Sequence, residues 1–202
     1  VYVNDSVNHT TSKKAYFIIS QEVEVGIIIN DKEGMKKNVS RIAILYPATG
    51  WERNESYNAS ILYSVLPKGT WRIDIADIIF NATLIDVNLT GNESINLTMD
   101  RLNESSINVD NISQLTRSII KAVFFHVEAD LSYTILRIPY NDSDIEEAKM
   151  SVFVCHNFTS YECNGSWENV TNMTSLDKSN NIVNVNLTSY SAILLTQDKY
   201  CG

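Results

Sequence analysis

Seventeen asparagines of this 202-residue chain stand in the tripeptide Asn-x-Ser/Thr, with no proline in the middle position. The side-chain amide of this tripeptide is the acceptor for N-linked sugar in exported proteins. With 22 asparagines, and serine or threonine at 35 positions, chance would give about 4 such tripeptides. The observed number therefore predicts a densely N-glycosylated chain. The predicted acceptors are Asn4, Asn8, Asn38, Asn54, Asn58, Asn81, Asn88, Asn92, Asn96, Asn103, Asn111, Asn141, Asn157, Asn164, Asn169, Asn172 and Asn186.

An alternative explanation is that a polar β surface simply favours Asn, Ser and Thr. Alternation along a strand raises the number of Asn-x-Thr tripeptides, but many of these tripeptides lie in turn-like stretches where alternation does not apply. Closely spaced acceptors, such as Asn169 and Asn172, are expected to compete for occupancy.

Two pairs of carboxylates are the other candidates for chemistry. Asp74 with Asp77, and Glu146 with Glu147, are close enough in the chain to bind calcium or to act as acid and base. Among 24 acidic residues such neighbours arise by chance, and a solvated surface is the simpler interpretation. No phosphate-binding loop, zinc-protease helix or nucleophile elbow is present in the sequence. We therefore predict no catalytic residue, no metal and no cofactor, apart from the covalent N-linked glycans.

The charge of the chain argues against two classes of partner. The net charge is −8, and the only basic doublets are Lys13-Lys14 and Lys36-Lys37. Nucleic acid and anionic membranes need clustered cations, so neither is expected as a partner. The longest apolar run, residues 15–29, is interrupted by polar residues and does not predict a membrane span. Residues 1–12 lack the apolar segment of a signal peptide, so we expect residue 1 to be the mature N-terminus of an exported protein.

Three cysteines bear on the compartment of the protein. Cys155 and Cys163 lie eight residues apart, and a local disulfide between them would suit a secreted protein. Cys201 is the odd one, and the sequence leaves open whether it is free or bonds another subunit.

Short strand-like runs rich in Val, Ile, Tyr and Thr recur along the chain, with polar turns between them. In three of them apolar residues alternate with the residues of an acceptor tripeptide. Ile85, Val87 and Leu89 alternate with the tripeptide of Asn88; Ile95, Leu97 and Met99 alternate with that of Asn96; and Val183, Val185 and Leu187 alternate with that of Asn186. This period of two is typical of antiparallel sheets with one solvated face. The predicted runs are 15–20, 23–29, 41–46, 60–65, 70–75, 83–89, 94–99, 121–128, 133–138, 149–155, 166–170, 182–187 and 191–195.

The cadence of these runs predicts an all-β protein built of two antiparallel, immunoglobulin-like β-sandwich domains with very little helix. Residues 143–148 are expected to form one helical turn, and residues 111–120 are either helical or a linker that leads directly into a strand.

The polar, sequon-rich stretch 101–113 is the predicted domain boundary. It would divide an N-terminal sandwich over 13–105 from a C-terminal sandwich over 114–202, and a single continuous fold is the alternative. Residues 1–12 are predicted to be an extension that donates a strand to a neighbouring molecule, or else a frayed terminus.

The C-terminal part of the chain contains a strand ending in a cysteine, residues 152–155, then a cysteine-bounded hairpin with a tryptophan, residues 163–167, and a Ser-rich last strand, residues 182–192. Over residues 120–200 this pattern resembles a module of archaeal secreted cell-surface glycoproteins, and residues 138–145 resemble the strand and turn that precede the hairpin in that module. The resemblance implies a β-sandwich at the cell envelope or in an appendage and brings no catalytic residues with it.

Together these features predict an extracellular or cell-surface structural protein that is not an enzyme. We expect a subunit of a thread-like or pilus-like filament, or of a surface layer, that self-assembles into a homopolymer through β-strand contacts. The first alternative is an adhesin or carbohydrate-binding ectodomain that recognises glycans or other surface proteins. A secreted hydrolase is the second alternative and would require converging carboxylates.

Overall fold

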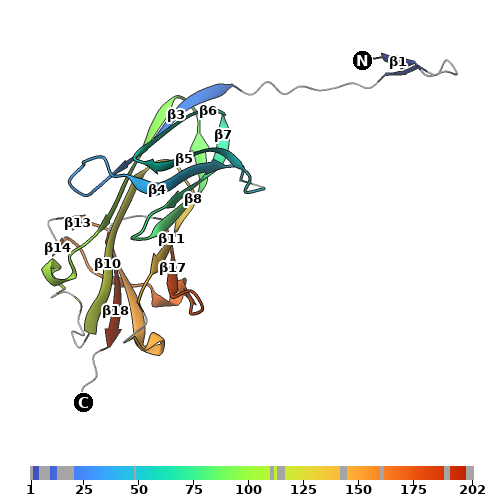
Figure 1. The fold of residues 1–202 in the computed structure, drawn as a ribbon. Coiled ribbons are helices and arrows are strands. Elements are labelled where there is room, and N and C mark those ends of the chain that lie inside the picture. Colours follow the sequence, from blue (N-terminus) through green and yellow to red (C-terminus); the bar gives the residue numbers. More distant parts are fainter. Residues whose placement is uncertain are drawn as a thin grey trace.

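The computed structural model of the chain describes residues 2–4, 10–12, 21–47, 49–109, 112, 117–141, 145–159, 162–188 and 192–198. The described residues form an all-β sandwich of two seven-stranded sheets (Figure 1). In order across sheet I the strands are β15 (Glu168–Asn169), β12 (Met150–Cys155), β18 (Ala192–Asp198), β10 (Arg117–Glu128), β9 (Glu93–Arg101), β3 (Glu22–Asn30) and β6 (Ile61–Pro67). Across sheet II they are β16 (Thr174–Asp177), β17 (Ile182–Leu187), β11 (Tyr133–Pro139), β8 (Asn81–Leu89), β7 (Gly69–Ala76), β4 (Val39–Leu45) and β5 (Glu52–Ala59).

All strand pairs are antiparallel except β3 and β9, which run parallel. The remaining elements are short: a hairpin of β1 (Tyr2–Asn4) and β2 (Thr10–Ser12), a hairpin of β13 (Phe158–Thr159) and β14 (Glu162–Cys163), and the 3-10 turns η1 (Glu104–Ser106), η2 (Glu147–Lys149) and η3 (Thr171–Met173).

The main core lies between the two sheets and extends through the whole sandwich. It is one connected cluster of buried apolar residues from both sheets, which includes residues as far apart in the chain as Val23 in β3 and Leu195 in β18. Within it Phe80 and Phe125 meet edge-to-face, with ring centroids 6.2 Å apart. Each large apolar side chain buried in this way stabilises the fold by about 1.5–3 kcal/mol.

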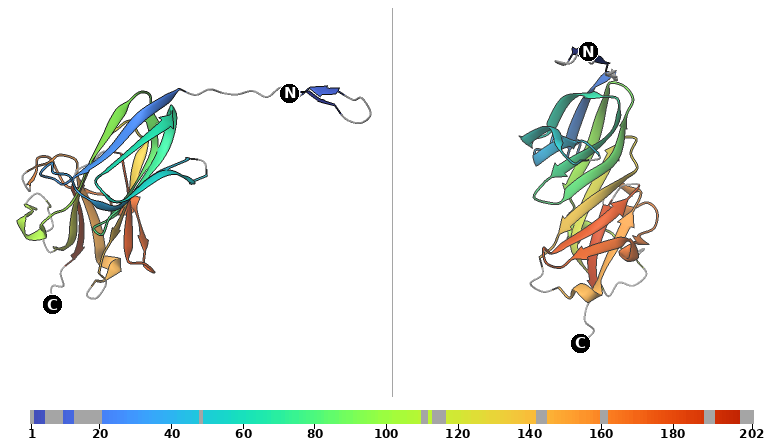
Figure 2. Two further views of the ribbon diagram at one scale, coloured as in Figure 1. Left: turned by 45° about the horizontal axis from the view of Figure 1, so that its top comes forward. Right: turned by 90° about the vertical axis from the view of Figure 1, so that its right-hand side faces the viewer.

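Strands from the two halves of the chain pair with each other in both sheets. In sheet I, Met99 of β9 lies opposite Phe125 of β10, and in sheet II, Ala82 of β8 lies opposite Leu136 of β11. Early strands gather toward one end of the molecule and late strands toward the other, with both sheets continuous between them (Figure 2). The strand pairing therefore describes one continuous sandwich rather than separate sandwiches over 13–105 and 114–202.

The expected boundary segment is packed rather than exposed. Leu102, Ile107 and Ile112 are buried and belong to a second apolar cluster on the outer face of sheet I. The segment is mostly polar, and its few apolar residues are spaced irregularly. Its sequence therefore predicts a linker, although these apolar residues pack on a sheet.

A lysine joins the two sheets. Lys121 of β10 donates its Nζ to the carbonyl oxygens of Ile79 and Pro139, at 2.6 and 2.8 Å, and both acceptors belong to the sheet II side of the sandwich. Burial, and to a smaller extent the charge of Arg101, lowers the pKa of Lys121 to about 8.

The helical expectations are corrected in part. Residues 117–120 belong to β10, so a helix over 111–120 is wrong there, and the alternative of a linker leading into a strand fits these residues. A single 3-10 turn is present at η2, whereas the expected start of that turn at Ser143 lies outside the described residues. The expected strand at 15–20 also lies outside them. None of the helices in the described part of the chain is long and apolar enough to cross a membrane.

Since one core serves both halves of the chain, we expect a single cooperative unfolding transition. Ile27→Ala in β3 and Leu136→Ala in β11 should each lower the free energy of unfolding by about 2–5 kcal/mol through the same transition. Scanning calorimetry should give equal calorimetric and van 't Hoff enthalpies for both variants, with Thr70→Ala, an exposed residue of β7 outside the acceptor tripeptides, as control. Two separate transitions, of which each variant moves only one, would contradict a continuous sandwich.

Candidate glycosylation surface and disulfide hairpin

The predicted acceptor asparagines lie at the surface of the sandwich. The structure describes the exposure of fourteen of them, and none is buried: ten are exposed and Asn54, Asn81, Asn88 and Asn96 are half-buried. Asn4 lies in β1, and Asn8 and Asn111 fall outside the described residues. Surface position is the first requirement for attachment of a bulky sugar, and every acceptor with a described exposure meets it.

Strand alternation places acceptors on outer faces as the sequence indicates. In β9, Ile95, Leu97 and Met99 are buried while Asn96 is half-buried on the opposite face. In β17, Val183, Val185 and Leu187 are buried while Asn186 is exposed. In both strands the buried apolar face fixes the direction of the asparagine.

Strand β8 departs from simple alternation. Ala82 and Leu84 are buried at even positions, whereas Val87 and Leu89 are buried at odd positions, and Ile85 is only half-buried. The register with β7 shifts between these pairs, and Asp86 adopts a φ of 55°. A residue inserted in this way is a β-bulge, which reverses the facing of all residues beyond it.

The bulge has a consequence for the two acceptors of β8. Asn81 and Asn88 are seven residues apart, an odd separation that would place them on opposite faces of a regular strand. With one extra residue between them, both lie opposite the buried face.

Strands buried on both faces contain no acceptors. The patterns of β12 and β18 are almost entirely buried, and neither strand contains an asparagine. There the neighbouring acceptors are found instead in the segments that cover sheet I, at Asn103, Asn157 and Asn164.

Two acceptors are held by the hydroxyl residue of their own tripeptide. Asn103 Oδ1 accepts hydrogen bonds from the backbone N–H and the Oγ of Ser105, at 3.2 and 2.8 Å. Asn169 Oδ1 accepts from the backbone N–H and the Oγ1 of Thr171, at 3.0 and 2.7 Å. These Asx-turns occupy the amide oxygen, so that the nitrogen that would carry a sugar faces away from the turn.

Other acceptors differ in which amide atom forms the hydrogen bond. Among the described residues, Asn92 bonds through Oδ1, which accepts from the backbone N–H of Glu24 at 2.9 Å. Asn54 and Asn88 instead use Nδ2, which donates to the carbonyl of Tyr63 at 3.2 Å and to Asp130 Oδ2 at 2.9 Å, respectively. An Nδ2 atom that becomes bonded to sugar retains one hydrogen, so these two contacts restrict how the sugar is directed.

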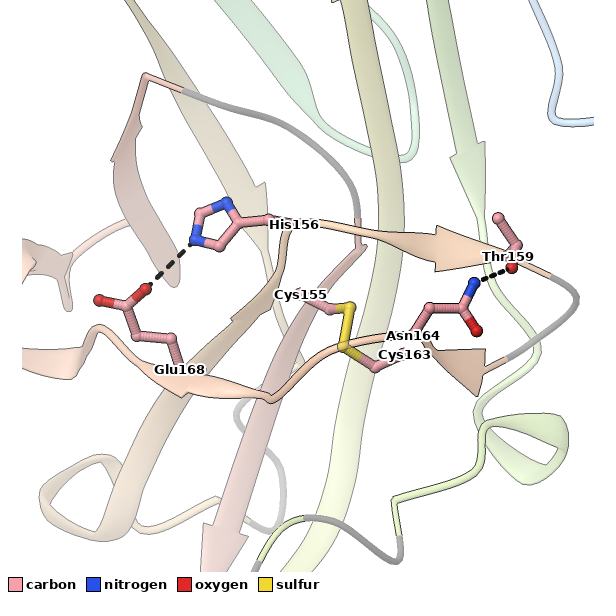
Figure 3. Close-up of a disulfide and its surroundings, with 6 residues drawn as sticks. All are labelled: Cys155, His156, Thr159, Cys163, Asn164 and Glu168. Carbon is pink, nitrogen blue, oxygen red and sulfur yellow. Dashed lines mark hydrogen bonds and ion pairs between the residues drawn. A yellow bond between two sulfur atoms is a disulfide. The ribbon is translucent and has the colours of Figure 1, made fainter.

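The cysteine pair expected from the sequence is bonded. Cys155 at the end of β12 and Cys163 in β14 form a disulfide with Cα atoms 5.9 Å apart (Figure 3). Beside it, His156 Nε2 lies 3.2 Å from Glu168 Oε2, and Asn164 Nδ2 donates to Thr159 Oγ1. Cys201 lies outside the described residues.

The disulfide hairpin packs onto the outer face of sheet I. Phe158 contacts Phe124 and Trp167, with ring centroids 6.4 and 5.9 Å away. Together with Cys155 and Cys163 these rings complete the second apolar cluster, which also contains Ala192 and Leu194 of β18. The hairpin thus forms a third layer at the C-terminal end of the sandwich.

The two carboxylate pairs of the sequence are occupied by separate partners. Asp74 receives two hydrogen bonds from Arg72, at 2.9 and 2.8 Å, while Asp77 Oδ2 lies 3.4 Å from Lys37 Nζ. Glu146 pairs with Lys149, and Glu147 with Tyr140 and Lys178. The bond from Tyr140, and then that from Lys178, lowers the pKa of Glu147. Within the described residues no three His, Cys, Asp or Glu side chains gather as a metal site.

No protein-family model matches the chain, and a search of curated proteins finds no match either. What the protein does is therefore inferred from its own residues.

The disulfide closes a loop with a sequence separation of 8. Replacing both cysteines by alanine should lower the free energy of unfolding by about 2–3 kcal/mol, because the open loop regains entropy in the unfolded chain. Chemical denaturation of the double variant measures this, and Glu162→Ala, an exposed residue of the same hairpin outside the acceptor tripeptides, is the control. A loss under about 0.5 kcal/mol for the double variant would show that packing alone holds the hairpin.

Proposed function

We propose that this protein is a densely N-glycosylated structural protein of the cell exterior, a subunit of a surface filament or surface layer that assembles through strand contacts. The observation that carries the proposal is that no acceptor with a described exposure is buried, although nine-residue strands such as β8 and β9 bury every apolar position on one face. The buried disulfide suits an oxidising compartment. The resemblance of residues 120–200 to archaeal surface glycoproteins points to the same location.

The edges of the sheets are consistent with this role. An open edge strand exposes unpaired backbone groups that invite pairing with another chain. Three of the four edge strands contain or adjoin acceptors: β5 contains Asn54 and Asn58, β15 contains Asn169, and β16 begins at the hydroxyl residue of the Asn172 tripeptide. Sugar at these positions would keep other strands away.

The fourth edge, β6, contains no acceptor within its seven residues, although it follows Ser60 of the Asn58 tripeptide and its Tyr63 carbonyl accepts a hydrogen bond from Asn54 Nδ2 at 3.2 Å. The backbone N–H of Ile29 donates to the carbonyl oxygen of Ser60 at 2.8 Å, so these two residues form a hydrogen-bonded pair. Hydrogen-bonded and non-bonded pairs alternate along an antiparallel ladder. The backbone groups of Tyr63 and Val65, which lie in non-bonded pairs, therefore point away from β3 toward the open side of β6. The side chains of Tyr63 and Val65 are 70% and 48% exposed. This edge is the one suited to pairing with a second copy of the chain.

The glycan coat is tested by the mass of the native protein. The intact mass should exceed the 22.8 kDa polypeptide by many kilodaltons and should fall to that value after deglycosylation. Peptide mapping should place sugar only on tripeptide asparagines, and the exposed Asn108 and Asn180, which lie outside such tripeptides, are internal controls. Native material with the mass of the bare chain would refute the proposal.

Assembly through β6 is tested by a proline at its edge. Val65→Pro removes an outward N–H without touching the ladder to β3 and should raise the critical concentration for assembly about tenfold, the effect of losing about 1.4 kcal/mol. Val65→Thr is the matched control, and Val65→Lys tests the same edge with the backbone intact. Electron microscopy and sedimentation give the readout. Unchanged assembly by folded Val65→Pro and Val65→Lys variants would exclude this edge.

An adhesin is the second candidate because of two exposed aromatic side chains at β5, the edge strand of sheet II at the same end of the sandwich. Trp51 before β5 is 75% exposed, and Tyr57 within β5 is 61% exposed. Aromatic faces of this kind are common in sugar-binding surfaces. Selective binding on a glycan array that is lost in Trp51→Ala would favour this candidate over a purely structural role.

A further inference from the structure

Three strands of sheet I form a regular outer face around Gly26. The register places Ser94 of β9, Gly26 of β3 and Tyr63 of β6 in one row across the strands. A neighbouring row contains Glu24 and Val65, and Asn92 joins it through its hydrogen bond to the N–H of Glu24.

The ring of Tyr63 lies on Gly26. A Cβ built on Gly26 would be 2.9 Å from Cε1 and 3.2 Å from Cδ1 of Tyr63, and 3.5 Å from Oγ of Ser94. The ring is therefore directed inward across β3, toward Ser94, and only glycine leaves room for it. Glycine inside a strand weakens the strand and often marks a place where a ligand approaches closely.

The outer surface of the same ring is open. Tyr63 is 70% exposed, and beside it is a shallow hollow lined by Glu24, Gly26, Asn92 and Ser94. An aromatic ring with one bare face, bordered by a carboxylate, an amide and a hydroxyl, matches the amphipathic surface of a pyranose. The apolar C–H face of the sugar covers the ring, and its hydroxyls meet the polar groups.

An acceptor asparagine lies at this hollow. Asn92 and Ser94 are the first and third residues of one acceptor tripeptide. Strand spacing and rise put the Cα of Asn92 about 8 Å from that of Gly26, within reach of the first sugar on an asparagine side chain. The bond from Glu24 to Oδ1 fixes the amide plane and leaves Nδ2 without a partner among the described residues.

We propose that the hollow beside Tyr63 seats the first sugar of the glycan on Asn92, with Tyr63 stacking on its C–H face. The inference rests on the proposed glycosylation and adds a site where sugar is part of the folded surface. The seated sugar lies over β3 and β9, so it leaves the outward backbone groups of Val65 in β6 uncovered.

Two neighbouring acceptors do not line this hollow. Asn54 lines a second hollow that also contains Tyr63, and its Nδ2 donates to the Tyr63 carbonyl. Asn96 lies within β9, four residues beyond Asn92, and does not line the hollow, which makes Asn96→Gln a matched control.

The first measurement is the occupancy of each acceptor, by peptide mass spectrometry of the native protein. If no asparagine is modified, the proposed function fails and the seat fails with it. If other acceptors are modified and Asn92 is bare, the seat alone is overturned. Modification at Asn92 permits the energetic test.

The energetic test is a double-mutant cycle in the glycosylated protein. Tyr63→Ala should lower the folding equilibrium constant about fivefold more when Asn92 carries sugar than in the Asn92→Gln background. Ser94→Ala, which removes the acceptor tripeptide but keeps the bond from Glu24, should give the same result as Asn92→Gln. Asn96→Gln should leave the coupling unchanged.

A ring that only covers Gly26 would show equal losses in all backgrounds, and that result would overturn the seat. The second readout is NMR of the glycan: ring current should shift the carbon-bound protons of the first sugar upfield, and Tyr63→Leu should abolish the shift. An unshifted spectrum in the glycosylated wild-type protein would also overturn the proposal.

Discussion

The two-residue period of an extended chain is the constraint on which the rest of this structure depends. Each strand of a two-sheet sandwich must give one face to the common core, so only the other face is available for polar chemistry. In β9 and β17 this rule by itself separates the buried aliphatic residues from Asn96 and Asn186. In β8 the alternation is interrupted once, by the bulge at Asp86. Because of this extra residue, Asn88 points outward like Asn81 although the two are seven residues apart. A bulge costs a ladder contact and a residue with positive φ, and here the result is that both ends of the strand present an acceptor tripeptide to solvent.

Much of the fold followed from this period, and the failures have identifiable causes. The all-β class and the strands at 23–29, 70–75, 94–99 and 182–187 were readable because apolar residues alternate there with polar ones. β5 was missed because its sequence, Glu52–Ala59, has no apolar face. A polar network holds it instead, in which Arg41 of β4 bonds Glu52 and Glu55, and the hydrogen bonds from Arg41 and then Tyr57 lower the pKa of Glu55. Pattern analysis finds strands that are held by burial, and an edge strand held by ion pairs gives no such signal.

The candidate site was predictable at the level of residues but not of geometry. The acceptor tripeptides and the pairing of Cys155 with Cys163 could be taken from spacing alone. Neither the continuity of the sheets across residues 101–113 nor the row of Ser94, Gly26 and Tyr63 could, because both depend on register between strands far apart in the chain. A lone glycine in a strand signals a close approach, but only the register shows that the approaching group is an aromatic ring beside an acceptor. The half-buried Lys121 was missed for the same reason: its two carbonyl partners come from the side of the opposite sheet.

The outer face of sheet I shows two ways of covering a sheet, and they exclude each other. At the C-terminal end, β12 and β18 bury both faces beneath the disulfide hairpin and a segment that contains Leu102, Ile107 and Ile112, and these strands lack asparagine. At the other end, the outer positions of β3, β6 and β9 are mostly polar, and the described residues form no third layer over the exposed Tyr63 and Val65. An attached sugar needs the space that a third layer would fill, while an uncovered apolar face needs that layer, so each stretch of the sheet adopts one solution. Tyr63 on Gly26 marks a place in this half of the sheet where apolar surface is exposed next to an acceptor, and there carbohydrate has the chemistry to serve as the cover.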